Sequence, residues 1–125
     1  MIGNEYLQGL FEYPDEDTSL NQLLELLKSK DKKFIDSLYI PVNIDICNDK
    51  EIRYLTLVSA LIDYYLQIYG LKVPDWLRDD KLSFKKPYYH SKRISEFDKI
   101  KLQYTNPSPL KARNVYFELE GIKRV

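Results

Sequence analysis

The side chains most able to do chemistry gather where aromatic and basic residues alternate, in the run Lys85-Lys86-Pro87-Tyr88-Tyr89-His90-Ser91-Lys92-Arg93. Aromatic rings beside positive charges bind single-stranded nucleic acid through base stacking and phosphate contacts. The same residue types anchor protein interfaces, where Tyr and Arg are enriched. An ordinary solvated loop can have this composition too. The run therefore indicates a binding surface for nucleic acid or protein, or a loop with neither role.

Side chains that usually carry catalysis or hold metals are scarce. His90 is the only histidine, Cys47 is the only cysteine, and the four glycines are scattered. A lone histidine cannot form a His-rich zinc site, a phosphate-binding loop needs closely spaced glycines, and no Ser-His-acid triad can be singled out. We assign Asp49 and Glu51 to helix capping and not to acid–base catalysis. The sequence thus predicts a protein that is not an enzyme, with no catalytic residue, metal site or cofactor.

Charge is distributed unevenly along the chain, although the formal net charge is zero. Residues 1–70 hold six Lys or Arg against twelve Asp or Glu, a net charge of −6. Residues 71–125 hold thirteen against seven, a net charge of +6. Such asymmetry indicates an electrostatic partner. The alternative is that the two halves fold together and neutralise each other.

The elements that must position these residues are mainly helices. The chain of 125 residues suits one domain spanning 1–125, with an acidic helical half and a basic half rich in Pro and aromatic turns. The strongest pattern predicts a helix over 49–69, capped by Asn48 and Glu51 and closed by Gly70. Its wide apolar face is typical of a central helix that is covered on more than one side. The sequence therefore predicts a mainly α, compact, single-domain helical bundle with a short extended C-terminal segment.

Weaker patterns predict the remaining elements. Ser19 and Gln22 indicate a capping box at the start of a second helix, and Asp31 could cap a third. The residues 42–46 alternate between apolar and polar, which favours an extended piece. A helix is expected from Ser91 to about Thr105, followed by a turn at Ser108-Pro109. The residues 115–117 are expected to form a short strand or a packed tail, and 119–125 a weak helical turn.

Transport and membrane signals are not apparent in the sequence. No segment contains the roughly 18 uncharged apolar residues that a membrane helix needs. The start of the chain lacks the basic and apolar regions of a signal peptide. We therefore expect a cytoplasmic protein with no membrane partner.

Two Pro-containing segments carry a resemblance to a known group of proteins. The matching residues are Gly70, Val73, Pro74, Trp76, Pro87, Tyr88, Ser108, Pro109, Arg113, Asn114 and Phe117. They resemble small bacterial proteins that are the non-catalytic, antitoxin-like halves of toxin–antitoxin gene pairs with a nucleotidyltransferase-like toxin. Longer members carry a helix-turn-helix domain ahead of this region, which is not recognisable here. Lys111-Ala112 also stands where the pattern has a larger apolar residue. The resemblance implies a partner-binding protein without catalytic residues.

The leading hypothesis is a regulator that docks on a partner protein through its basic, aromatic half and covers an acidic, metal-binding active site. The expected anchors are Trp76, Tyr88, Arg93, Arg113 and Tyr116. Trp76 is also expected to pack on the central helix, whereas Arg113 is expected to be partly exposed, so that its loss would change stability little. The alternative is a nucleic-acid-binding regulatory protein. An enzyme is a third hypothesis and would require a bound metal or cofactor.

Overall fold

The computed structural model describes residues 1–90 and 95–117. Within these ranges the chain is mainly helical, which confirms the predicted fold class. The elements in chain order are α1 (Glu5–Phe11), α2 (Glu16–Lys28), α3 (Lys32–Ser37), the 3-10 turn η1 (Ile44–Ile46), α4 (Asp49–Ile68), the 3-10 turn η2 (Asp75–Arg78), β1 (Tyr88–Tyr89), α5 (Glu96–Thr105), α6 (Ser108–Ala112) and β2 (Val115–Tyr116).

Helix α4 forms where the sequence predicts it. The side chain of Asn48 accepts a hydrogen bond from the Glu51 backbone, and Glu51 accepts one from the Asn48 backbone, which completes the capping box. Gly70 follows the helix with φ of 69°, a conformation that favours glycine. Buried residues on α4 include both aliphatic and polar side chains, so most of its circumference is covered.

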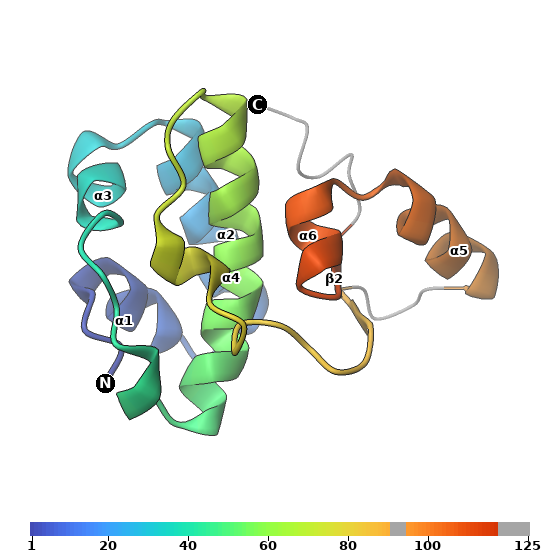
Figure 1. The fold of residues 1–125 in the computed structure, drawn as a ribbon, viewed down its shortest axis with the longest axis horizontal. Coiled ribbons are helices and arrows are strands. Elements are labelled where there is room, and N and C mark those ends of the chain that lie inside the picture. The colour runs from blue at the N-terminus through green and yellow to red at the C-terminus, as the bar shows by residue number, and fades with distance from the viewer. Residues whose placement is uncertain (91–94, 118–125) are drawn as a thin grey trace.

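Helix α4 lies between two groups of elements. In Figure 1, α1, α2 and α3 lie on one side of α4, whereas α6 and α5 lie on the other. Helix α4 contacts α2 on the first side and α6 on the second, and η2 packs against it as well. The core is continuous across α4, because buried residues from both groups belong to one cluster. The prediction of a central helix covered on more than one side is confirmed.

The start of the second helix and the type of structure over 42–46 were predicted wrongly. Helix α2 begins at Glu16 and is capped by Asp15, not by Ser19. The Ser19 hydroxyl is buried and bonds the Leu10 carbonyl and the Tyr54 hydroxyl, both at 2.7 Å, so it joins α2 to α1 and α4. The expected extended piece over 42–46 contains the 3-10 turn η1 instead. Asp31 does cap α3, since its side chain accepts a hydrogen bond from the Phe34 backbone.

The second half of the chain folds back on itself through a short parallel strand pair. Strand β1 pairs with β2 in the register Tyr88 to Val115 and Tyr89 to Tyr116. The two strands bracket α5 and α6, and α6 packs against both α4 and β2. The predicted short strand near 115–117 is therefore confirmed. The part of the predicted helix over 91–94 and the predicted turn over 119–125 lie outside the described residues.

Candidate functional site

Three of the five predicted anchors are buried within the chain. Trp76 and Tyr116 are each 8% exposed and Arg113 is 4% exposed. The indole Nε1 of Trp76 donates to the Leu38 carbonyl at 2.6 Å, so this ring links η2 to the end of α3. The expectation that Arg113 is partly exposed is wrong. Because a docking anchor must be reached by the partner, we do not assign these three side chains to a docking surface.

Arg113 instead joins α6 to the central helix. Its Nη2 donates to Asp63 Oδ2 at 2.9 Å and to the Leu77 carbonyl at 2.6 Å, and its Nη1 donates to the Pro109 carbonyl at 2.7 Å. Arg78 binds the same carboxylate with Nε at 2.9 Å and Nη2 at 3.1 Å. Gln67 also donates to it at 2.8 Å. We call Asp63, Gln67, Arg78 and Arg113 the Asp63 cluster.

The electrostatics of the Asp63 cluster follow from burial and from the opposing charges. Burial alone would raise the pKa of Asp63, but the donors from Arg78, Gln67 and Arg113 outweigh it and hold this pKa below its usual value. Burial lowers the pKa of Arg113, and the charge of Arg78 adds to that effect. Two guanidinium groups thus share one carboxylate, and the hydrogen bonds to the charged form keep Asp63 ionised.

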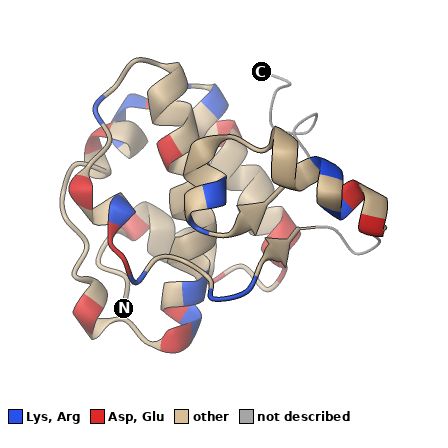
Figure 2. Cartoon of the chain, turned by 45° about the vertical axis from the view of Figure 1, so that its right-hand side comes forward, with Lys and Arg blue, Asp and Glu red and all other residues tan. Residues whose placement is uncertain are grey.

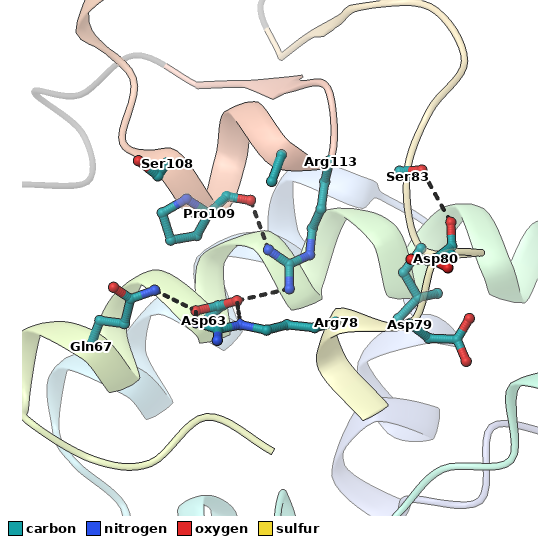
Figure 3. Close-up of a pocket in the computed structure, with 11 residues that line it drawn as sticks. Asp63, Gln67, Arg78, Asp79, Asp80, Ser83, Ser108, Pro109 and Arg113 are labelled. Atoms are coloured by element: carbon teal, nitrogen blue, oxygen red, sulfur yellow. Dashed lines mark hydrogen bonds and ion pairs between the residues drawn. The ribbon is translucent and has the colours of Figure 1, made fainter. Parts of the chain in front are cut away.

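A pocket of about 360 Å³ opens beside the Asp63 cluster. Figure 3 shows Arg113 descending from the end of α6, with Asp63 and Pro109 on one side and Asp79, Asp80 and Ser83 on the other. The residues that line it come from α4, η2, the following loop and α6: Asp63, Gln67, Arg78, Asp79, Asp80, Leu82, Ser83, Ser108, Pro109, Ala112 and Arg113. The pocket is therefore formed where the two halves of the chain meet.

The aromatic residues of the basic run are already engaged by the protein. The Tyr88 ring stacks on Phe84 with centroids 5.3 Å apart, and Arg53 lies 5.3 Å from its centroid. The Tyr88 hydroxyl donates to Glu16 at 2.8 Å. Tyr89 stacks on Tyr116 at 5.0 Å. Each ring therefore already has an aromatic neighbour within the protein, and a nucleic acid base could stack only on the part of the ring that is left uncovered.

Of the other two residues singled out in this run, the structure describes His90 but not Arg93. The His90 Nε2 lies 3.0 Å from Asp17 Oδ1, which attaches the run to α2. Arg93, the fifth predicted anchor, lies outside the described residues. Within the described ranges, no three His, Cys, Asp or Glu side chains come together as metal ligands.

Charge in the two halves is partly neutralised by contacts between them. Arg78 and Arg113 pair with Asp63, Lys81 pairs with Asp45, and these pairs link the basic half to the acidic half. Figure 2 shows basic and acidic residues interspersed on the helical body and on α5. Part of the asymmetry seen in the sequence is therefore used to hold the fold together.

Helix α5 carries three of the exposed large apolar side chains in the described part of the chain. Phe97, Ile100 and Tyr104 are 75%, 54% and 80% exposed, although their types normally favour the core. Leu102, in contrast, is buried, so α5 packs on the body with a different face. We call Phe97, Ile100 and Tyr104 the α5 face. Figure 1 shows α5 projecting beyond α6, away from α4.

Sequence reasoning predicted a helix over this region but did not predict the exposure of the α5 face. The available signal was Leu102, which places an apolar residue on the opposite side of a ten-residue helix that can bury only one side. The Asp63 cluster also had a signal. A carboxylate in the middle of the apolar face of 49–69 requires a buried partner of opposite charge.

Comparison with known proteins adds no identification: no family model, no curated protein and no solved structure matches this chain. None of the helices in the described part of the chain is long and apolar enough to cross a membrane.

Proposed function

We propose that this chain is a non-catalytic, antitoxin-like regulator that binds a partner protein through the α5 face. The observation that carries the proposal is the exposure of Phe97, Ile100 and Tyr104 on one helix. Exposed apolar patches on a folded domain mark interaction sites. Their spacing is i, i+3 and i+7, which is the pattern of a helix that inserts into an apolar groove.

The neighbouring elements make α5 suitable for docking. Ser95 caps the helix, because its hydroxyl accepts a hydrogen bond from the Asp98 backbone at 3.1 Å. At the other end, the Asn106 side chain donates to the Leu102 carbonyl at 3.0 Å and accepts from the Phe117 backbone at 3.2 Å. The helix is therefore capped at its N-terminal end and joined at its C-terminal end to the residue that follows β2. Such preorganisation reduces the entropy lost on binding.

The partner is proposed to present an apolar groove bordered by acidic groups. Lys101 is exposed on α5, as are the acidic residues Glu96 and Asp98 in its first turn, and Lys85 and Lys86 are exposed on the loop before β1. Opposite charges around an apolar centre would orient the two proteins during encounter. An acidic, metal-binding active site of a nucleotidyltransferase-like toxin, the partner class implied by the sequence resemblance, has this chemistry.

Co-expression with the product of the adjacent gene tests the proposal. We expect the two proteins to co-elute in size-exclusion chromatography, and we expect Phe97→Asp/Tyr104→Asp to abolish co-elution. Ile46→Asp is the control, because Ile46 is also an exposed apolar residue, at 67%, but lies on η1 and outside the α5 face. Co-elution that survives the double substitution would remove the α5 face from the proposal.

The alternative of nucleic acid binding makes a different prediction. Phosphate contacts would make affinity fall steeply between two salt concentrations. Binding of generic single-stranded or duplex nucleic acid at low salt, unaffected by Phe97→Asp/Tyr104→Asp, would favour that alternative.

A further inference from the structure

The residue that follows strand β1 is a histidine whose ring faces the first turn of α2. The His90 Nε2 lies 3.0 Å from Asp17 Oδ1, and the Nδ1 lies 3.2 Å from the Tyr88 hydroxyl oxygen. The ring is 25% exposed, and its centroid lies 4.8 Å from that of Phe117. Both ring nitrogens are therefore close enough to an oxygen atom to form a hydrogen bond.

The hydrogen bonds of Tyr88 decide which of these atoms donates. A tyrosine hydroxyl has one proton, and Tyr88 donates it to Glu16 Oε1 at 2.8 Å. Burial alone would raise the pKa of Glu16, but the hydrogen bonds from Arg53 and Tyr88 and the nearby positive charge outweigh burial and hold this pKa below its usual value. Glu16 is therefore ionised and can only accept. The Tyr88 oxygen has only lone pairs left for the Nδ1 of His90.

Each ring nitrogen of His90 thus faces an acceptor. Asp17 presents a carboxylate oxygen to Nε2, and Tyr88 presents a lone pair to Nδ1. A neutral imidazole has one N–H group and one bare nitrogen, whereas an imidazolium has two N–H groups. Only the imidazolium form of His90 can donate in both contacts at once.

The charges around the ring favour the same form. Within the described part of the chain, α2 presents two carboxylates to it, because Glu16 Oε1 lies 3.9 Å from Nδ1 in addition to the contact with Asp17. The guanidinium of Arg53, on α4, pairs with Glu16. Burial raises the pKa of Tyr88 to about 12, so this side chain stays neutral. Two negative charges against one positive charge leave a net negative environment, which favours a protonated ring.

His90 also belongs to the strand pair on which α5 is mounted. Its backbone N–H donates to the Tyr116 carbonyl at 2.9 Å, one of the bonds that join β1 to β2. The Gln103 side chain, on α5, donates to the hydroxyl of Tyr89 on β1 at 2.8 Å. The contact of the His90 ring with α2 therefore connects the acidic half of the chain to the strands that α5 contacts.

We propose that His90 is a pH-dependent attachment: its protonated ring fastens the β1–β2 pair to α2, and loss of the proton loosens the pair. The folded state holds this proton more tightly than the open state. The stabilisation is therefore complete below about pH 6.5, where a free histidine is protonated as well, and is lost as the pH rises through neutrality.

This pH range isolates His90 from the other titratable groups. It is the only histidine of the sequence. The hydrogen bond to Glu51 raises the pKa of the Met1 amine above 8.0. The attachment acts within the chain and does not rest on the proposed partner of the α5 face.

Nitrogen-15 nuclear magnetic resonance of the imidazole ring tests the protonation directly, because the shifts of Nδ1 and Nε2 distinguish imidazolium from either neutral form. At about pH 7 an unperturbed histidine is roughly one-quarter protonated. We expect the ring of the folded wild type to be more than half protonated at that pH, and the same chain unfolded in urea to give the lower fraction. A mostly neutral ring in the folded protein would overturn the proposal.

Hydrogen exchange of the His90 backbone amide tests the attachment, since this amide is released when the strand pair opens. After correction for intrinsic exchange rates, we expect its protection to fall at least about twofold between pH 6 and pH 8. His90→Gln should be independent of pH, and Asp17→Asn should show a smaller fall than wild type. Asp36→Asn is the matched control, because it removes an exposed carboxylate on α3 and should behave like wild type.

Three outcomes of the exchange experiment would contradict the attachment. Protection in the wild type that does not change with pH would show that the ring proton does not hold the strands. A fall that persists in His90→Gln would assign the effect to another group. Equal responses of Asp17→Asn and Asp36→Asn would show a general effect of net charge and not a contact with His90.

Discussion

Helices α6 and α5 are neighbours in the basic half of the chain, but they relate to the rest of the molecule in opposite ways. Helix α6 buries Pro109 and Leu110 and is followed by Arg113, which reaches the central helix. Helix α5 buries Leu102 and leaves Phe97 and Tyr104 in solvent. A charged residue is thus inside and aromatic residues are outside, which is the reverse of what residue type alone suggests.

The difference separates attachment from binding. Buried ions need fixed partners of opposite charge, and α4 supplies Asp63 as the partner of Arg113. Phe97 and Tyr104, in contrast, are largely exposed to solvent in the described part of the chain. Burial against another surface would give them a favourable hydrophobic free energy. The comparison therefore assigns α6 to stability and the α5 face to a proposed partner.

The largest effect on stability is expected for a substitution in the buried centre of α4. Leu61 is 1% exposed in the centre of this helix, and Leu61→Asp would bury a carboxylate without a partner. Its cost exceeds what a domain with about 5–15 kcal/mol of stability can absorb. Circular dichroism should show loss of helix. A helical Leu61→Asp variant that melts cooperatively would contradict the central position of α4.

The second-largest effect on stability is expected for Arg113→Ala, which tests whether Arg113 acts inside the fold or at the surface. Arg113→Ala removes one side of a buried ion pair while Asp63 keeps Arg78. We expect a loss of about 3 kcal/mol, which lowers the melting temperature by roughly 10 °C. Lys81→Ala, which breaks the exposed pair with Asp45, is the control and should cost only about 0–1 kcal/mol. Equal melting of the two variants would show that Arg113 contributes no more than a surface pair.

The sequence predicted the elements that local signals define. Asn48, Glu51 and Gly70 locate α4, and Asp31 locates α3, because capping depends on residues a few positions apart. Arg113 could not be placed in this way. It meets Asp63 across 50 positions of sequence, and only tertiary packing brings the two together. The exposure of Phe97 was missed for the same reason, since helical spacing shows which residues share a face but not what covers that face.

The dependence of folding stability on pH tests how much the charge of Asp63 contributes to the fold. The pKa of Asp63 is lower in the folded state than its ordinary value, so its contribution is complete above the unfolded pKa of about 3.9 and is lost as pH falls through the folded pKa. Asp63→Asn should therefore be less stable than wild type near neutral pH, and the difference should shrink below about pH 4. Melts of wild type, Asp63→Asn and the surface control Asp36→Asn measure it. A pH-independent difference would show that the charge of Asp63 is not involved.

The smallest effect on stability is expected on the α5 face. Phe97 is 75% exposed, so Phe97→Ala removes little buried area and should change stability by no more than about 0.5 kcal/mol. Differential scanning calorimetry checks this directly. A large loss of stability would mean that the ring is already covered within the folded chain.

The central claim is that α5 binds while α6 holds the fold together, and the affinity of Phe97→Ala for the adjacent gene product tests it most directly. Isothermal titration calorimetry on folded protein should show at least tenfold weaker binding than wild type, as for a loss of more than about 1.4 kcal/mol at an interface anchor. Ile46→Ala, at an exposed apolar position outside the α5 face, should bind like wild type. An unchanged dissociation constant for Phe97→Ala would contradict the account.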